Sequence, residues 1–263
     1  MPHIETPSGI NWFYEEKGKG KMLVFIHGWS FDSKVWSKQI DNFKGYKIIT
    51  LDLPGHGNSG YKKEIDSVKD LHFIFEKLKL DKINLIGHSF GGFIALKFTL
   101  NYPQLTHKIV LIGTNAKFVK SADYEFGLSE KDVEKLRSFI ADNYPEILCI
   151  FMRWLFTNQE RGQNGFREIW DAISKRKIWP KKEALGEFLN IIEKDDLRNG
   201  LKKINQPVLI ISGSDDPICP VESQNYLGKE IRNSRVELFE NCGHLPFLTS
   251  ADKFNELIKD FIK

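Results

Sequence analysis

The chain is poor in cysteine, with only Cys149, Cys219 and Cys242 among its 263 residues. This odd, widely spaced set contains no CxxC pair, which excludes a disulfide framework and a cysteine-based zinc site. No apolar run approaches the ~20 residues that a membrane-spanning helix needs. The start of the sequence also lacks the basic residues and apolar run of a secretory signal. We therefore expect a cytoplasmic protein that does not act at a membrane.

The chain also lacks an excess of charge of either sign. Its 38 Lys and Arg residues against 35 Asp and Glu residues give a net charge of +3. Such a mild balance does not indicate a nucleic-acid partner. Hydrophobic residues make up 41% of the sequence and charged residues 28%, which is typical of a folded globular protein. No group of Asp, Glu or His residues has metal-ligand spacing, so we expect neither a metal nor a cofactor.

Short apolar runs recur along the sequence, and most are followed closely by Gly or Pro. Such runs predict buried strands of a parallel sheet, here at residues 22–26, 46–51, 83–86, 108–112, 207–212 and 236–239. Between them, residues 66–80, 92–102 and 251–262 carry apolar residues at the spacing of one helix face. Because strand and helix alternate, we predict an α/β fold with a mostly parallel central sheet and helices on both faces.

One stretch, residues 116–196, breaks this alternation because it contains only helical patterns. It is too long to be a loop, so we predict a helical cap inserted into the core. The core would then comprise residues 1–115 and 197–263. The cap is rich in large aromatic residues that could wall an acyl channel or form the cap's own core: Phe118, Phe139, Phe151, Trp154, Phe156, Phe166, Trp170 and Trp179.

The strongest chemical signal is the G-x-S-x-G pattern at residues 87–91, which lies between a predicted strand and a predicted helix. A serine at the tip of such a tight turn is exposed to substrate, and the glycines leave room for the close backbone approach. We therefore predict that Ser89 is a catalytic nucleophile. The alternative is a glycine-rich turn with no catalytic role.

A serine nucleophile needs a base, and the base needs an acid that orients it. His244 follows the last predicted strand, and Asp215 and Asp216 follow the strand before it. This gives the chain order nucleophile, acid, histidine that is expected for this motif. We favour Asp216 over Asp215 because it directly precedes Pro217. The alternative for His244 is an ordinary surface histidine.

The oxyanion formed during acyl transfer needs two backbone N–H donors. One is expected from the residue after the nucleophile, Phe90, and the other from the loop after the strand at 22–26. We predict Trp29 as the second donor. His27, in the same loop, is expected to order it by hydrogen bonding.

Together these residues resemble the α/β-hydrolase superfamily, over essentially the whole chain. The segments HGW…VW at 27–36, DDLR at 195–198 and GHLPF at 243–247 resemble one branch, the pimeloyl-ACP methyl ester esterases of biotin synthesis. The resemblance implies a serine carboxylesterase that acts on the methyl ester of pimeloyl-ACP. One position differs: His88 precedes the serine, where that branch carries Trp.

The resemblance further implies that basic residues of the cap bind an acyl carrier protein. Arg153, Arg161 and Arg167 are the candidates here, with Trp29 and Phe151 as candidate substrate contacts. A solvated basic helix face is the alternative. We expect a monomer. A general carboxylesterase, a lactonase, a C–C bond hydrolase or a non-catalytic ligand-binding protein on the same fold remain alternatives for the function.

Overall fold

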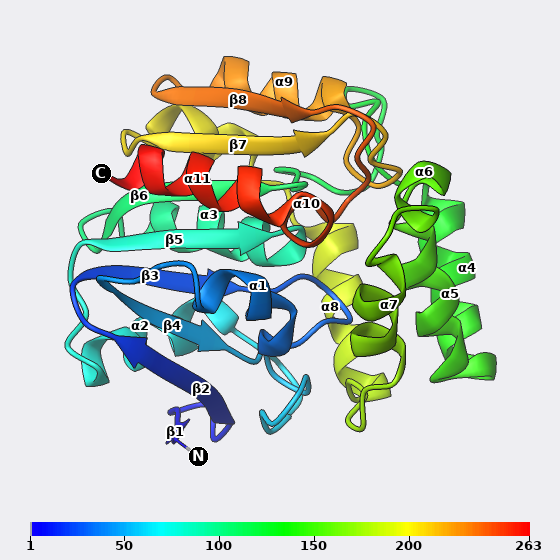
Figure 1. Cartoon of the computed structure of the whole chain (residues 1–263). Helices are drawn as coiled ribbons and strands as arrows, with labels where there is room; N and C mark the ends of the chain where they lie inside the picture. The colour runs from blue at the N-terminus through cyan, green and yellow to red at the C-terminus, as the bar shows by residue number, and fades with distance from the viewer. Residues whose placement is uncertain (1) are drawn as a thin grey trace.

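The computed structural model describes residues 2–263, and its centre is an eight-stranded sheet in the order β1-β2-β4-β3-β5-β6-β7-β8 (Figure 1). The strands from β3 to β8 are all parallel. The bounds of the strands are β1 His3–Glu5, β2 Asn11–Gly18, β3 Lys21–Ile26, β4 Tyr46–Leu51, β5 Ile83–His88, β6 Thr106–Ile112, β7 Val208–Gly213 and β8 Ser234–Phe239.

The predicted fold class is confirmed, and each of the six predicted strands is present. Every residue of β5 and of β7 is buried, as their continuous apolar sequences imply for strands covered on both faces. Strands β1 and β2, which the apolar runs did not predict, extend the sheet in antiparallel fashion beyond β4. In β2 only Trp12 and Phe13 are buried, because charged residues fill its second half. That strand therefore lacks the apolar run that identified the others.

Helices cover both faces of the sheet, as predicted. In Figure 1, α1 (Ser37–Ile40) and α11 (Ala251–Ile262) lie in front of the sheet, while α2 (Ser67–Lys77) and α3 (Phe90–Asn101) lie behind it. The remaining core helices are η1 (Ser33–Trp36), η2 (Arg198–Lys203), α9 (Val221–Glu230) and α10 (Pro246–Thr249).

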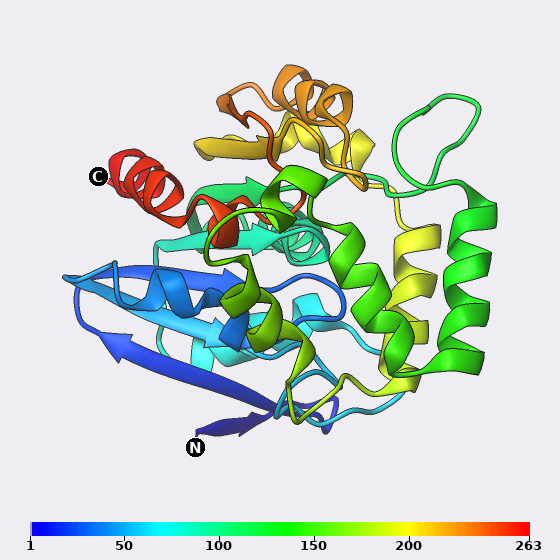
Figure 2. The same cartoon turned by 45° about the vertical axis from the view of Figure 1, so that its right-hand side comes forward.

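Residues 116–196, which lie between β6 and η2, contain five α-helices. Two isolated β-bridges, between Val119 and Leu128 and between Ser121 and Tyr124, precede them. We call residues 116–196 the helical insertion. Figures 1 and 2 show its helices gathered at the end of the sheet to which the arrows of the parallel strands point. The helices are α4 Glu130–Asn143, α5 Glu146–Trp154, α6 Asn158–Arg161, α7 Phe166–Ser174 and α8 Lys182–Lys194.

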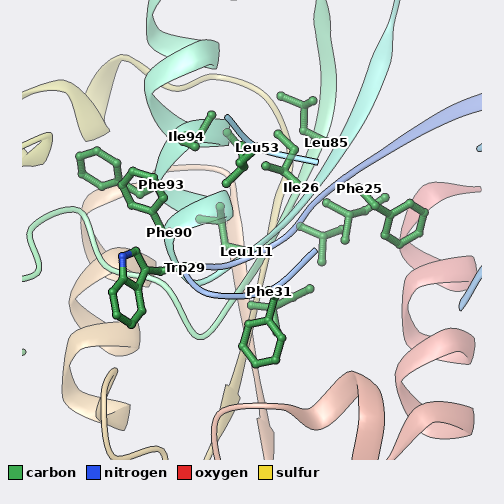
Figure 3. Close-up of a cluster of buried hydrophobic side chains, with 14 of the residues drawn as sticks. Phe25, Ile26, Trp29, Phe31, Leu53, Leu85, Phe90, Phe93, Ile94 and Leu111 are labelled. Carbon is green, nitrogen blue, oxygen red and sulfur yellow. The ribbon is translucent and has the colours of Figure 1, made fainter. Parts of the chain in front are cut away.

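The strand order changes direction at β3, which lies between β4 and β5. Ile26 at the end of β3 is in register with Gly87 near the end of β5, so the loops that follow these two strands lie side by side. Ligands of open α/β sheets bind at such a switch point, outside the carboxyl ends of the strands. Figure 3 shows the apolar cluster beneath it, where Phe90 and Phe93 of α3 lie near Trp29 of the loop after β3.

Within residues 2–263, no helix combines the length and the hydropathy needed to cross a membrane.

Candidate active site

Ser89 occupies a tight turn between β5 and α3. Its φ of 51° lies in the left-handed region, a conformation that costs a non-glycine residue about 1–3 kcal/mol. The turn is held because the Ser89 N–H donates to Ile112 O of the neighbouring strand at 2.8 Å. The structure thus places Ser89 where the sequence predicted, in a strained turn that the surrounding backbone maintains.

The glycines of the motif are required by close backbone contacts. A Cβ atom on Gly87 would lie 2.5 Å from Gly91 O, and one on Gly91 would lie 2.5 Å from His27 O. Real Cβ atoms essentially never come this close to backbone oxygens. The G-x-S-x-G spacing therefore reflects the packing of the turn against the loop after β3.

His244 and Asp216 form a buried hydrogen-bonded pair. His244 Nδ1 lies 2.7 Å from Asp216 Oδ2, and the two side chains are almost fully shielded from solvent. The other carboxylate oxygen, Oδ1, accepts the backbone N–H groups of Ile218 at 2.8 Å and Cys219 at 2.9 Å. Because the ionised carboxylate only accepts, the proton of neutral His244 resides on Nδ1 and leaves Nε2 free as a base.

The two adjacent carboxylates of this loop have different partners. Asp215 accepts the Ser214 hydroxyl through Oδ2 at 2.8 Å, and its own N–H donates to Cys242 O at 3.0 Å. Of these two carboxylates, Asp216 is the one that hydrogen-bonds the imidazole.

The segment directly after β6 lies next to both the serine turn and the His–Asp pair. Thr114 Oγ1 donates to Ser89 O at 2.6 Å. A Cβ atom on the adjacent Gly113 would lie 2.9 Å from Asp216 Oδ2 and 3.0 Å from His244 Nδ1. The structure therefore brings the three predicted catalytic residues together around one short segment.

His88 has a role that the sequence analysis missed. Its ring is buried beside the His244 ring, with centroids 4.7 Å apart, and its Nε2 lies 3.1 Å from His244 O. Burial, with a further contribution from the His244 charge, lowers the pKa of His88 well below its ordinary value. A neutral His88 that donates from Nε2 therefore holds the backbone of the predicted base.

The two predicted oxyanion donors lie on the adjacent loops after β3 and β5. Phe90 is the first residue of α3, so its N–H has no acceptor within its own helix. Trp29 is buried, and its indole N–H donates to Leu185 O of the helical insertion at 3.2 Å. Its ring meets Phe151 of α5 edge-on, with centroids 5.2 Å apart.

The insertion is also hydrogen-bonded to the loop after β3 through Arg176, which follows α7. Its Nη1 donates to Ser30 O at 2.7 Å, and Ser30 has a left-handed φ of 69°. Burial lowers the pKa of Arg176 from its ordinary value, although Asp32 opposes the shift. Arg176 therefore supports the loop, and its guanidinium is not free for a partner.

His27 orders its loop, as expected. Its Nδ1 lies 2.8 Å from Gly28 O, and its Nε2 accepts the Leu53 N–H at 2.9 Å, which ties the loop after β3 to the loop after β4. Burial is the main cause that lowers the pKa of His27, so the ring remains neutral with Nε2 as an acceptor.

The predicted carrier-binding arginines lie on the helical insertion but differ in surroundings. Arg153 and Arg167 are exposed. Arg153 also lies over the Trp170 ring, 5.6 Å from its centroid. Arg161 is half-buried, and its Nε donates to Thr157 O at 3.2 Å. These contacts leave Arg153 and Arg167 as the two more accessible cations.

The aromatic residues of the insertion differ in burial and in the residues that they contact. Phe118, Phe156 and Phe166 are buried, whereas Phe139 and Trp154 are 47% and 49% exposed. Among the predicted aromatics, Phe151 is the one that contacts Trp29 beside the serine turn. Phe151 is therefore the one of these aromatic residues that packs against the loop after β3 through Trp29.

Ligand atoms of Asp216, Cys219 and His244 lie within 4.8 Å of one another, a spacing that would allow them to bind one metal ion. Both carboxylate oxygens of Asp216 already accept hydrogen bonds. Burial, with a contribution from Asp216, raises the pKa of the Cys219 thiol well above its ordinary value, whereas metals bind the thiolate. This donor set suits proton transfer better than metal binding.

A family model described as the alpha/beta hydrolase fold matches residues 21–251. This chain belongs to the α/β-hydrolase fold family. Among curated proteins, the hydrolase is similar to the pimeloyl-[acyl-carrier protein] methyl ester esterase of Nitrosospira multiformis, with 30% identity over 256 residues that cover 93% of this chain and 95% of the relative. It is 28% identical over 241 residues to the enzyme of that name from Nitrosomonas europaea, covering 91% and 95% of the two chains.

Solved structures give the same family. An esterase from Exiguobacterium antarcticum matches the hydrolase with a TM-score of 0.91 and 27% identity, covering 99% of this chain and 98% of the esterase. A protein named as a bromoperoxidase, from Bacillus anthracis, matches with a TM-score of 0.89 and 29% identity, covering 99% of both chains. The predicted family is thus confirmed, and the esterase relatives support the predicted hydrolase activity.

Proposed function

We propose that this hydrolase cleaves a carboxylic ester through an acyl-enzyme on Ser89, and that its substrate is the methyl ester of pimeloyl-acyl carrier protein in biotin synthesis. The observation that carries the reaction is the buried hydrogen bond between His244 and Asp216, next to the strained turn of Ser89. The substrate is inferred from relatives of that name, which match 91% and 93% of the chain.

In the first half of the reaction, Ser89 Oγ attacks the ester carbonyl carbon while His244 Nε2 accepts the hydroxyl proton. Asp216 holds the imidazole in the required tautomer and stabilises the imidazolium that forms. The negative charge of the tetrahedral intermediate rests on the backbone N–H groups of Trp29 and Phe90. Loss of one such donor typically lowers kcat about 10²–10³-fold.

Collapse of this intermediate breaks the bond to the leaving oxygen, and His244 gives its proton to that oxygen to release methanol. In the second half, His244 takes a proton from water, and the resulting nucleophile attacks the acyl-enzyme carbonyl. Breakdown of this second intermediate returns the proton to Ser89 and releases the free acid.

In this proposal, residues 116–196 act as a cap over a core formed by residues 1–115 and 197–263. Arg153, Arg161 and Arg167 would bind the acidic carrier protein, and Phe151 with Trp29 would contact the acyl chain. The exposed position of Arg153, between the 67% exposed Ile150 and the 49% exposed Trp154 on α5, supports a docking role. Electrostatic attraction would steer the carrier and fix its register.

The deciding experiment is growth rescue of a biotin-requiring strain that lacks its methyl ester esterase. The hydrolase should restore growth without biotin, whereas Ser89→Ala should not. In such triads, loss of the serine lowers turnover by about 10⁶-fold. Failure of the wild-type protein to rescue growth, although it is expressed and folded, would refute the proposed substrate.

Purified pimeloyl-ACP methyl ester separates this function from a general carboxylesterase, a lactonase or a C–C bond hydrolase. Its turnover should weaken with salt and with Arg153→Glu, because both reduce the attraction between cap and carrier. Lys229→Glu, an exposed charge reversal on α9, is the matched control and should have little effect. A ligand-binding protein without enzymatic function would show no Ser89-dependent turnover of any ester.

A further inference from the structure

Glu160 is a carboxylate buried inside the hydrolase, only 2% exposed, on the short helix α6 of the insertion. Its Oε2 accepts the backbone N–H groups of Thr157 at 2.7 Å and Gly243 at 3.1 Å. Its Oε1 accepts the Thr249 hydroxyl at 2.7 Å and the Cys242 thiol at 3.3 Å. All four donors are neutral groups.

A buried carboxylate is strongly unfavourable unless hydrogen bonds replace its lost hydration. The four donors fill the acceptor sites that an ionised carboxylate offers. Burial raises the pKa of the Cys242 thiol above its ordinary range, and the charge of Glu160 raises it further, so this thiol stays protonated and able to donate. The surroundings of Glu160 are therefore built to hold a carboxylate.

Three of these four contacts cross from the helical insertion to the chain between β8 and α11, which carries His244 (Figure 1). Glu160 accepts a hydrogen bond from the N–H of Gly243. Leu155 O accepts one from the next N–H, that of His244, at 2.9 Å. A Cβ atom on Gly243 would come within 3.0 Å of Glu160 Oε2 and still closer to Leu155 O. Two consecutive amides at the predicted base are thus fixed by the insertion.

Three polar groups of His244, namely Nδ1, the carbonyl oxygen and the backbone N–H, have separate partners. Asp216 holds the ring through Nδ1, and His88 holds the carbonyl oxygen. The amide side is held by the insertion, through Leu155 directly and through Glu160 one residue earlier. The direction in which the imidazole leaves the backbone therefore depends on residues outside the core sheet.

We propose that Glu160 is a positioning residue for His244. It anchors residues 242–244 to the helical insertion, so that the imidazole keeps the orientation in which Nδ1 meets Asp216. The inference rests on the proposed function, since it assigns Glu160 a part in the reaction only through the proposed base.

The alternative is a purely local role, because Glu160 also completes a capping box with Thr157 at the start of α6. The same chain shows that a shorter acid is sufficient for such a box. At the start of α4, Ser129 pairs with Asp132 at the equivalent position. Capping alone therefore does not require glutamate, whereas the longer side chain is needed to reach Gly243.

This difference gives two informative variants. Glu160→Asp keeps the charge and an acid suited to the capping box, but its carboxylate no longer reaches Gly243. Glu160→Gln keeps the length, and its carbonyl oxygen can still accept the N–H groups of Thr157 and Gly243. Its amide NH₂ then faces Thr249 and Cys242, whose oxygen and sulfur atoms can accept.

With a p-nitrophenyl ester as substrate, Glu160→Asp should lower kcat about 10- to 100-fold with little change in KM, because a shift of about 1 Å in a catalytic group has an effect of this size. Glu160→Gln should stay within about threefold of wild-type kcat, because it preserves the contact to Gly243. Unchanged kcat in Glu160→Asp would overturn the proposal.

The matched control is Glu187 on α8, another carboxylate that joins the insertion to the core. It accepts the Tyr61 hydroxyl at 2.9 Å and the Ile65 N–H at 2.7 Å, in a loop that carries no predicted catalytic residue. Glu187→Asp should retain wild-type kcat even where it lowers the melting temperature. Equal losses of kcat in Glu187→Asp and Glu160→Asp would assign the effect to general docking of the insertion and overturn the proposal.

Two further measurements separate this inference from the proposed function. Hydrogen exchange at the Gly243 and His244 amides should be faster in Glu160→Asp than in wild type, whatever the substrate. A fluorophosphonate probe should label Ser89 in wild type and label Glu160→Asp more slowly. If wild type is neither labelled nor active on any ester, the hydrolase function fails, and exchange still reports whether Glu160 holds the loop. Unchanged exchange overturns the positioning role by itself.

Discussion

Asp216→Asn is the most demanding test of the proposed site, because the structure determines which way the new amide points. In the wild-type protein, Oδ1 of Asp216 accepts two backbone N–H groups, those of Ile218 and Cys219. An asparagine must keep its carbonyl oxygen on these two donors, since its NH₂ group would repel them. The NH₂ group therefore faces His244 Nδ1.

That orientation reverses the hydrogen bond to the imidazole. Nδ1 of His244 must now accept, so the ring proton moves to Nε2, the atom that has to take the proton of Ser89. An acid-to-amide change of this kind lowers kcat by about 10⁴-fold in a serine triad. At about 1.4 kcal/mol for each factor of ten, the loss corresponds to about 5.5 kcal/mol of transition-state stabilisation.

The assay is steady-state hydrolysis of a p-nitrophenyl ester, with circular dichroism and thermal melting as checks on folding. Asp215→Asn is the matched control, because Asp215 hydrogen-bonds Ser214 and not the imidazole, and it should stay near wild-type kcat. A well-folded Asp216→Asn variant that retains more than about a tenth of wild-type kcat would refute the reasoning about the tautomer.

Two more predictions concern the surroundings of the site. Gly113→Ala places a methyl group 2.9 Å from Asp216 Oδ2, at a residue whose φ is 49°. We therefore expect kcat to fall and the melting temperature to drop by about 2–8 °C. No change in either quantity would contradict the predicted clash. In the folded protein, burial lowers the pKa values of His56 and His88 well below 6.5. As the pH falls through 6.5, the unfolded chain therefore binds more protons than the folded protein does. The free energy of unfolding, measured by urea denaturation, should therefore reach its maximum above pH 7. It should decrease below pH 6.5 by up to about 1.4 kcal/mol per pH unit for each histidine. If the slope of this free energy against pH is unchanged in His56→Gln, His56 does not contribute to the pH dependence.

The sequence predicted those parts of the fold that depend on local signals. Continuous apolar runs predicted the six parallel strands, and the glycines around Ser89 predicted the turn, because backbone packing leaves no room for larger residues there. Asp216 and His244 were predicted from their places after consecutive strands, which the α/β topology brings to one edge of the sheet. The edge strands β1 and β2 were missed because they are short or half-charged.

The supporting contacts could not be predicted in the same way. Glu160 meets Gly243 across 83 residues of sequence, and Arg176 meets Ser30 across 146. Nothing in the sequence around either residue distinguishes it from a surface charge on an amphipathic helix. Their roles depend on how the helices of the insertion pack against the core, which helical periodicity alone does not determine.

Because the helical insertion is hydrogen-bonded to the loop that carries His244, replacing it with the insertion of a relative would affect the predicted base. Leu155 and Glu160 supply acceptors for the amides of His244 and Gly243, so a graft that replaces all of residues 116–196 also removes two supports of the proposed base. Chimeras designed to alter substrate choice would keep the parental segment 155–160 and exchange only the helices around it. Changes in this part of the insertion would therefore also alter the hydrogen bonds to the amides of Gly243 and His244.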